Sequence, residues 1–272
     1  MLLYFFLKIM IQKIIIKDPK DTPVEYADKV FAPGRTFEFR DGVNIIVGPN
    51  GSGKSALLNL MRRYLVIPEG VDHVCTSKWQ YDGFVDDNWS KGRIHGGAVL
   101  NADYKSNAFF MPEPHVCFEH SLSGGASLAY WKETSGKSCG QTTSALLDHL
   151  CERMKTLPKT VDYFKDSDGC TGNYWNGGMA RAYRHYVEAN SIPYNGTCTV
   201  MLDEPDKNLD VFKVKELSET LLSMPHMGLQ VIAVIHNPLL IVKLHSCYGV
   251  YFIEMTPGYA SSVVEEVKNI AK

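Results

Sequence analysis

Residues 43–55 read VNIIVGPNGSGKS, and this stretch decides the fold. Its first five residues form an apolar run with the length of a buried strand. A glycine-rich loop follows, and KSALLNLMRRYL over 54–65 then carries apolar residues at helical spacing. The stretch therefore predicts a strand, a tight loop and a helix in direct succession, which is typical of an α/β fold.

The loop indicates a chemistry of its own, because 48–55 fits the pattern G-x-x-x-x-G-K-[ST]. Glycines let backbone N–H groups curl around phosphate oxygens, and the following helix presents its positive N-terminal end. A lysine neutralises the outer phosphates, and a hydroxyl group ligates magnesium. We therefore expect ATP and Mg²⁺ as ligands, with Ser55 bound to the metal. The expected ATP-binding residues are Gly48, Pro49, Asn50, Gly51, Ser52, Gly53, Lys54, Ser55 and Ala56.

A second apolar strand, expected at 199–203, ends in two adjacent carboxylates. Asp203 is suited to the magnesium shell, and Glu204 is suited to polarising an attacking water. A further apolar stretch over 229–236 ends in His236. These strand ends are expected to form the second half of the phosphate site.

Strands and helices alternate towards the C-terminus, which predicts α/β architecture with a mixed sheet around the phosphate loop. We expect one domain over 1–272, with 66–195 as an inserted helical or irregular lobe. The expected strands are 11–17, 30–40, 43–47, 199–203, 229–236 and 249–255, and the expected helices are 54–65, 141–157, 179–190 and 211–224.

Three segments carry a family resemblance: GPNGSGKS (48–55), LDEPDKNLD (202–210) and VIHNP (234–238). They resemble the phosphate loop, the Walker B motif with its D-loop, and the switch histidine of ABC-type P-loop ATPases. DGVNIIVGPNG (41–51) is similar to the corresponding segment of the soluble SMC/RecF-like and OLD-like (AAA-family) branch.

The resemblance implies Mg-dependent ATP hydrolysis at the interface of a head-to-tail homodimer that forms on ATP binding. It makes Glu204 the catalytic base and His236 the sensor of the γ-phosphate, alongside the catalytic Lys54. Asn208 and Asp210 fall in the D-loop, which contacts the second subunit.

The resemblance also implies a signature loop that is donated in trans. We prefer Ser138, Gly140 and Gln141, because these residue types precede a predicted helix. Asn176, Gly177 and Gly178 are the alternative, because their distance from Asp203 along the chain is the usual one. LSGG at 122–125 is interpreted as a loop.

Other candidates have weaker support in the sequence. Tyr26 is placed to stack on adenine or simply to pack on the sheet, and Gln80 is a candidate for the glutamine that couples magnesium to the inserted lobe. His115, Cys117 and His120 lack a second ligand pair at zinc spacing. Trp131, Tyr174 and Trp175 are interpreted as local core rather than as base-stacking residues.

Composition excludes several classes of protein. The chain has 272 residues, 45% of them hydrophobic, and 28 Lys and Arg against 30 Asp and Glu, a net charge of −2. This balance does not support nucleic-acid binding, which would need a local basic patch. The longest apolar run, 1–7, is too short to span a membrane. Seven cysteines without a C-x-x-C pair fit reduced thiols in a cytoplasmic protein.

These observations predict a soluble ATPase that drives or gates a separate effector protein. The resemblance to the soluble branch suggests a role in DNA repair, mobile-element function or phage defence. Two alternatives remain: an ATP-binding subunit of a membrane ABC transporter, and an ATP-gated scaffold with little turnover.

Overall fold

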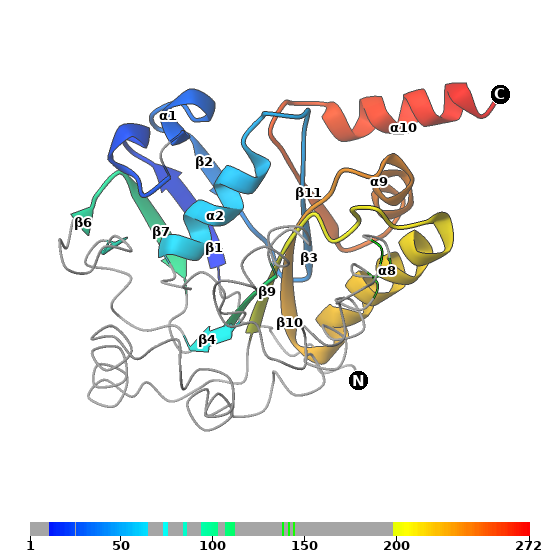
Figure 1. Cartoon of the computed structure of the whole chain (residues 1–272), viewed down its shortest axis with the longest axis horizontal. Helices are drawn as coiled ribbons and strands as arrows, with labels where there is room; N and C mark the ends of the chain where they lie inside the picture. Colours follow the sequence, from blue (N-terminus) through cyan, green and yellow to red (C-terminus); the bar gives the residue numbers. More distant parts are fainter. Residues whose placement is uncertain are drawn as a thin grey trace.

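The computed structural model (Figure 1) describes residues 11–24, 26–64, 73–75, 84–85, 94–102, 107–111, 138, 141, 144 and 198–272. The predicted helix over 179–190 lies outside these residues. So do several single candidates: Gln80, His115, Cys117, His120, Trp131, Gly140, Tyr174, Trp175, Asn176, Gly177 and Gly178. Of the predicted helix over 141–157, two residues are described, and both are helical.

The central sheet has six strands in the order β11-β3-β10-β9-β8-β4. Neighbours from β11 to β8 are parallel, and β4 is antiparallel to β8. Every residue of β3 and β10 is buried, as expected for strands covered on both faces. The strands are β3 (Val43–Val47), β4 (His73–Cys75), β8 (Asn107–Met111), β9 (Cys198–Asp203), β10 (Leu229–Val234) and β11 (Val250–Glu254).

A second, antiparallel sheet has the order β2-β1-β7, with β1 (Ile11–Ile16) at its centre. Its outer strands are β2 (Thr36–Glu38) and β7 (Ala98–Ala102). The burial of β7 alternates along the strand, as in a sheet with one face on the core. Two short strands, β5 (Phe84–Val85) and β6 (Ile94–His95), pair with each other.

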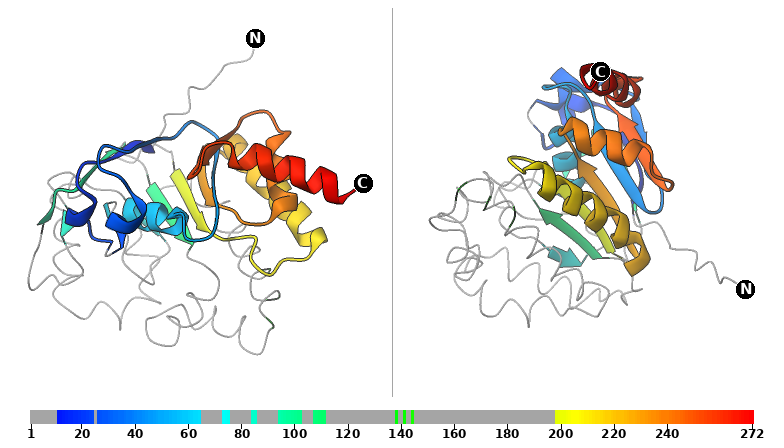
Figure 2. Two further views of the ribbon diagram at one scale, coloured as in Figure 1. Left: turned by 90° about the horizontal axis from the view of Figure 1, so that it is seen from above. Right: turned by 90° about the vertical axis from the view of Figure 1, so that its right-hand side faces the viewer.

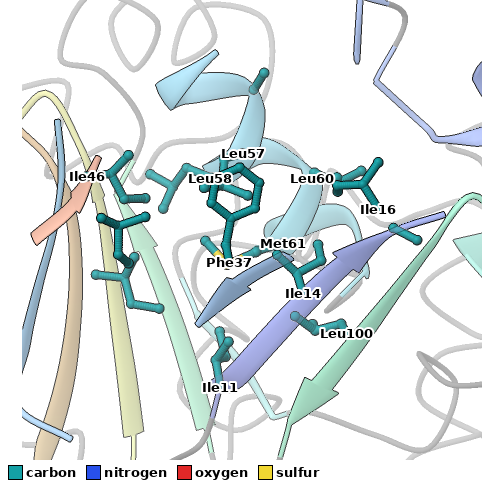
Figure 3. Close-up of a cluster of buried hydrophobic side chains, with 14 of the residues drawn as sticks. Ile11, Ile14, Ile16, Phe37, Ile46, Leu57, Leu58, Leu60, Met61 and Leu100 are labelled. Atoms are coloured by element: carbon teal, nitrogen blue, oxygen red, sulfur yellow. The ribbon is translucent and has the colours of Figure 1, made fainter. Parts of the chain in front are cut away.

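Helices cover the two faces of the central sheet. Helix α2 (Lys54–Tyr64) packs its apolar side against β1, β2 and β7 and against one face of the central sheet (Figure 3). On the other face lie α8 (Val211–Ser223), α9 (Pro238–His245) and α10 (Tyr259–Ile270), and in the left view of Figure 2 the cyan α2 and the yellow-to-red helices stand on opposite sides. Short helical turns complete the described fold: η1 (Pro19–Asp21), α1 (Ala27–Val30) and η3 (Met224–Met227).

The predicted α/β class with a mixed sheet is confirmed. The expected strand over 30–40 is wrong in its bounds, because only Thr36–Glu38 pairs with β1. Strands β7 and β8 lie within the segment expected as an inserted lobe, yet they pair with β1 and β9. That part of 66–195 therefore builds the two main sheets. Within the described residues no helix is both long and apolar enough to cross a membrane.

A buried side chain, Gln230, ties the two sheets together. Its Oε1 accepts from the backbone N–H of Ile11 at 3.0 Å and from Thr199 Oγ1 at 2.6 Å. Its Nε2 donates to the carbonyls of Ile11 at 2.8 Å and Arg40 at 3.2 Å. One amide thus meets the hydrogen-bonding needs of β1 at the point where it approaches β10.

We expect Gln230→Leu to lower the free energy of unfolding by about 3 kcal/mol, because several buried polar groups lose their partner at once. Urea unfolding followed by circular dichroism measures the change. Gln12→Leu is the matched control, because Gln12 lies exposed on the neighbouring strand β1. If both variants lost the same free energy of unfolding, the role assigned to Gln230 in joining the two sheets would be contradicted.

Candidate ATP-binding and hydrolysis site

The phosphate loop lies between the end of β3 and the start of α2. Gly53 has a φ of +94°, and a Cβ atom there would lie 2.9 Å from Val30 Cβ. At Gly48 a Cβ atom would lie 2.7 Å from Met255 Cβ. Both positions are therefore restricted to glycine, one by conformation and space and the other by space alone. The loop's course is fixed by its neighbours α1 and β11 as well as by its own sequence.

Lys54 is buried, with 4% of its surface exposed. Its Nζ donates to the carbonyls of Gly48 at 2.9 Å and Pro49 at 2.8 Å. Burial lowers the pKa of Lys54, and attraction from Glu204 and Asp203 acts against that shift. The ammonium group therefore sits over the first residues of the loop, within electrostatic range of the carboxylates that follow β9.

Three adjacent strands end at the same edge of the sheet, as parallel strands do. The phosphate loop follows β3, His236 follows β10, and Asp203 closes β9. Ser55 Oγ donates to Asp203 Oδ1 at 2.9 Å, so the first turn of α2 contacts the end of β9. The two residues expected to bind magnesium lie together.

Asp203 is a costly residue for the fold to bury. It is 6% exposed, and burial raises its pKa to about 6, although the hydrogen bond from Ser55 acts in the other direction. Ser52 Oγ, in the loop itself, is buried without a hydrogen-bond partner among the described residues. Hydroxyl and carboxylate oxygens are the ligands that Mg²⁺ prefers, and a cation would offset the desolvation of Asp203. The residues present therefore fit Mg²⁺ bound to Ser55 and Asp203.

Glu204 follows in a left-handed conformation, with a φ of +50°. Its Oε1 accepts from His236 Nε2 at 2.8 Å, and its Oε2 lies 3.6 Å from Lys207 Nζ. The hydrogen bond from His236 lowers the pKa of Glu204, which overcomes the opposing effect of burial. The carboxylate is thus ionised at neutral pH and remains partly exposed, with 20% of its side chain accessible.

Asp206 also belongs to this edge of the sheet, although it is not among the site residues predicted from the sequence. It is 4% exposed, and its Oδ2 accepts from the backbone N–H groups of His236 and Asn237. The only indication of Asp206 in the sequence is that it is a third acidic residue shortly after Asp203 and Glu204. The residue type alone does not indicate that it binds the backbone of His236 and Asn237.

Other predicted residues lie away from these contacts. Tyr26 precedes α1 and is 46% exposed. Asp210 caps the N-terminus of α8 by accepting from the N–H groups of Phe212 and Lys213, and Asn208 has a φ of +59°. The two residues predicted for the D-loop therefore shape the turn between β9 and α8.

Ser138 and Gln141 form a reciprocal pair. The backbone N–H of Ser138 donates to Gln141 Oε1 at 2.9 Å, and the backbone N–H of Gln141 donates to Ser138 Oγ at 3.4 Å. This is the arrangement of a capping box at the start of a helix. Two residues of the preferred signature segment thus form a capping box, while its Gly140 lies outside the described residues.

Of the comparisons with known proteins, a family model overlaps the phosphate loop. A protein-family model described as "AAA domain" matches residues 29–65. No curated protein matches the chain.

Among solved structures, cbiO1 of Clostridium perfringens, described as part of the ABC transporter complex cbiONQ, is 16% identical, with a TM-score of 0.36 over 96% of this chain and 94% of that chain. The SMC head domain of Thermotoga maritima is 15% identical, with a TM-score of 0.41 over 92% of this chain and 96% of that chain. A nucleotide-free ATP-binding cassette from an ABC transporter is 15% identical, with a TM-score of 0.37 over 90% of this chain and 88% of that chain.

The family match covers the phosphate loop and its helix, and the rest of the site comes from the strand ends that the central sheet brings beside that loop. Over residues 29–65 the chain is therefore similar to the AAA-domain family, in the segment that holds the phosphate loop and α2.

Proposed function

We propose that the chain binds ATP with Mg²⁺, hydrolyses it, and uses the cycle to drive or gate a separate effector protein. The contacts at the end of β9 carry the proposal. Ser55 meets Asp203 at 2.9 Å, and the next residue, Glu204, meets His236 at 2.8 Å. The pair proposed to bind the metal and the proposed base with its orienting partner therefore lie side by side, next to the phosphate loop.

Each residue has a role that follows from its position. Lys54 and the N–H groups of the loop bind and orient the β- and γ-phosphates. Ser55 and Asp203 hold Mg²⁺, which neutralises charge that develops on the phosphate oxygens. Glu204, ionised and partly exposed, accepts a proton from the attacking water. His236 holds the Glu204 carboxylate in orientation and donates to the γ-phosphate when that contact is exchanged.

A second copy of the chain is proposed to complete the site, in a head-to-tail homodimer formed on ATP binding. The capping box of Ser138 and Gln141 supports this segment as the signature loop, because it forms a helix N-terminus, and helix N-termini bind phosphate groups. Asn176, Gly177 and Gly178 remain the alternative. A cytoplasmic role in DNA repair, mobile-element function or phage defence is the biological setting that we propose from the family.

Glu204→Gln tests the proposed hydrolysis. The amide keeps the shape of the side chain and cannot take a proton, so we expect kcat to fall about 100-fold or more while MgATP still binds. Because ATP then persists, the homodimer is expected to survive size-exclusion chromatography with MgATP. Phosphate release and elution volume are the two measurements.

Glu219→Gln is the control for that experiment, because Glu219 is an exposed residue of α8. Hydrolysis by Glu204→Gln within about twofold of the parent rate would contradict the role of base. A monomer with and without MgATP would contradict the dimer.

A further inference from the structure

Asp206 is the one buried carboxylate at this edge of the sheet, among the described residues, that the proposed chemistry does not use. It lies in the turn directly after Glu204. Burial raises its pKa, and hydrogen bonds from Asn237 and His236 act against that shift. An apolar side chain would avoid the desolvation of a carboxylate, so packing alone does not account for an acid here.

The hydrogen bonds of Asp206 converge on one short segment. Its Oδ2 accepts from the N–H of His236 at 2.8 Å and also from the N–H of Asn237. Its Oδ1 is buried without a hydrogen-bond partner among the described residues. The hydrogen bonds that Asp206 Oδ2 accepts therefore come from two successive backbone N–H groups between β10 and α9.

That segment is already fixed on both sides. Before it, the N–H of Ile235 donates to the carbonyl of Ile46 at 3.2 Å, which keeps the end of β10 on β3. After it, Asn237 Oδ1 accepts from the N–H of Leu239 at 2.9 Å and caps α9. Only the backbone at His236 lies between these anchors, and Asp206 is the group that holds it.

We propose that Asp206 is a positioning residue for the Glu204–His236 pair. By fixing the backbone of His236 from the turn that follows Glu204, it sets the direction in which the imidazole leaves the chain and brings Nε2 to the carboxylate. The inference rests on the proposed hydrolysis, because it assigns Asp206 a part in the same step. Asp206 touches neither nucleotide nor water in this scheme and acts only through His236.

Substitutions at Asp206 separate its acceptor oxygen from its charge and its volume. Asp206→Asn keeps an oxygen that can accept from both N–H groups, whereas Asp206→Leu fills the same space without an acceptor. We expect kcat of Asp206→Leu to fall about 10- to 100-fold with KM for ATP within about twofold, and kcat of Asp206→Asn to stay within about threefold of the parent. Asp206→Ala serves as the smaller variant if leucine prevents folding.

A double-mutant cycle with His236→Ala decides whether the effect runs through the histidine. If Asp206 acts only through His236, the double variant is no slower than His236→Ala alone. If the two losses multiply, Asp206 acts by another route and the proposal is overturned.

Amide hydrogen exchange tests the same contact without any activity. In the nucleotide-free chain, a peptide covering 235–239 is expected to exchange faster in Asp206→Leu than in the parent and to exchange normally in Asp206→Asn. Unchanged exchange in Asp206→Leu and Asp206→Ala would overturn the proposal. If the parent chain hydrolyses no ATP, the proposed hydrolysis is refuted. The hydrogen-exchange result would still support the assignment that Asp206 fixes the backbone of His236.

Discussion

Asp203→Asn should raise the melting temperature of the nucleotide-free protein by several degrees at about pH 7.5 and lower Mg-dependent hydrolysis about 1000-fold. Stability rises because the amide removes a buried charge while it can still accept from Ser55. Hydrolysis falls because the metal loses its anionic ligand. Differential scanning fluorimetry and phosphate release measure the two effects.

The stability gain has a defined pH dependence. Burial raises the pKa of folded Asp203 to about 6, above its ordinary value, so the folded state binds the proton more tightly than the unfolded state does. Stability from this group is therefore greatest at low pH and is lost as the pH rises from about 4 to about 6. We expect Asp203→Asn to exceed the parent fully above about pH 6 and to lose its advantage at about pH 4.

The control for Asp203→Asn is Glu219→Gln, which removes one negative charge from an exposed position of α8. Its melting temperature should follow the parent at each pH. An Asp203→Asn variant that is less stable than the parent at about pH 7.5 would show that the carboxylate stabilises the nucleotide-free fold, contrary to this expectation.

Lys54→Met should lower kcat/KM for MgATP about 1000-fold or more. The substitution removes the cation that we propose to bond to phosphate oxygens, a contact worth about 1.5–3 kcal/mol in binding, and with it the proposed charge stabilisation in the transition state. Isothermal titration calorimetry with MgATP and phosphate release under excess ATP separate the two losses.

We expect Lys54→Met to fold, because burying a methionine side chain requires no desolvation of a charge, whereas burying lysine does. Circular dichroism of the nucleotide-free variant checks it. Lys215→Met, at an exposed site on α8, is the matched control and should bind MgATP as the parent does. Equal affinity of Lys54→Met and Lys215→Met for MgATP would contradict the phosphate site.

The parts of the fold that follow from local sequence could be predicted. The strand, loop and helix over 43–64 depend on an apolar run, on glycines and on helical spacing, all of which lie within one segment. Strand β8, NAFFM over 107–111, could not be predicted this way. The sequence on either side of it lacks hydrophobic periodicity, and its pairing partner β9 lies far along the chain. Long-range pairing decides its structure.

Helix α9 shows a second kind of limit. PLLIVKLH over 238–245 is apolar and short, so its hydrophobicity alone does not distinguish a helix from a strand. The signals for a helix were present, namely Asn237 as N-cap and Pro238 at the first helical position. Together, the N-cap and the proline favour a helix over a strand for this apolar segment.

At the candidate site, the sequence indicates Lys54, Asp203, Glu204 and His236, but it does not indicate the contacts that these side chains make. Glu204 and His236 were named separately, but their contact depends on β9 and β10 lying in register. Asp206 was missed because its partners are backbone N–H groups, which leave no mark on the residue types. Residue types indicate which side-chain chemistry is present. They do not indicate which backbone groups a side chain binds.

The strand order of the central sheet also bears on how the protein is made. Strand β3 carries the phosphate loop, yet the strands on either side of it, β10 and β11, come from the last part of the chain. During synthesis β3 therefore emerges long before either neighbour exists, and pairing at such separation is intrinsically slow. The phosphate loop therefore gains the two strands that flank β3 only after residues 229–254 have been synthesised.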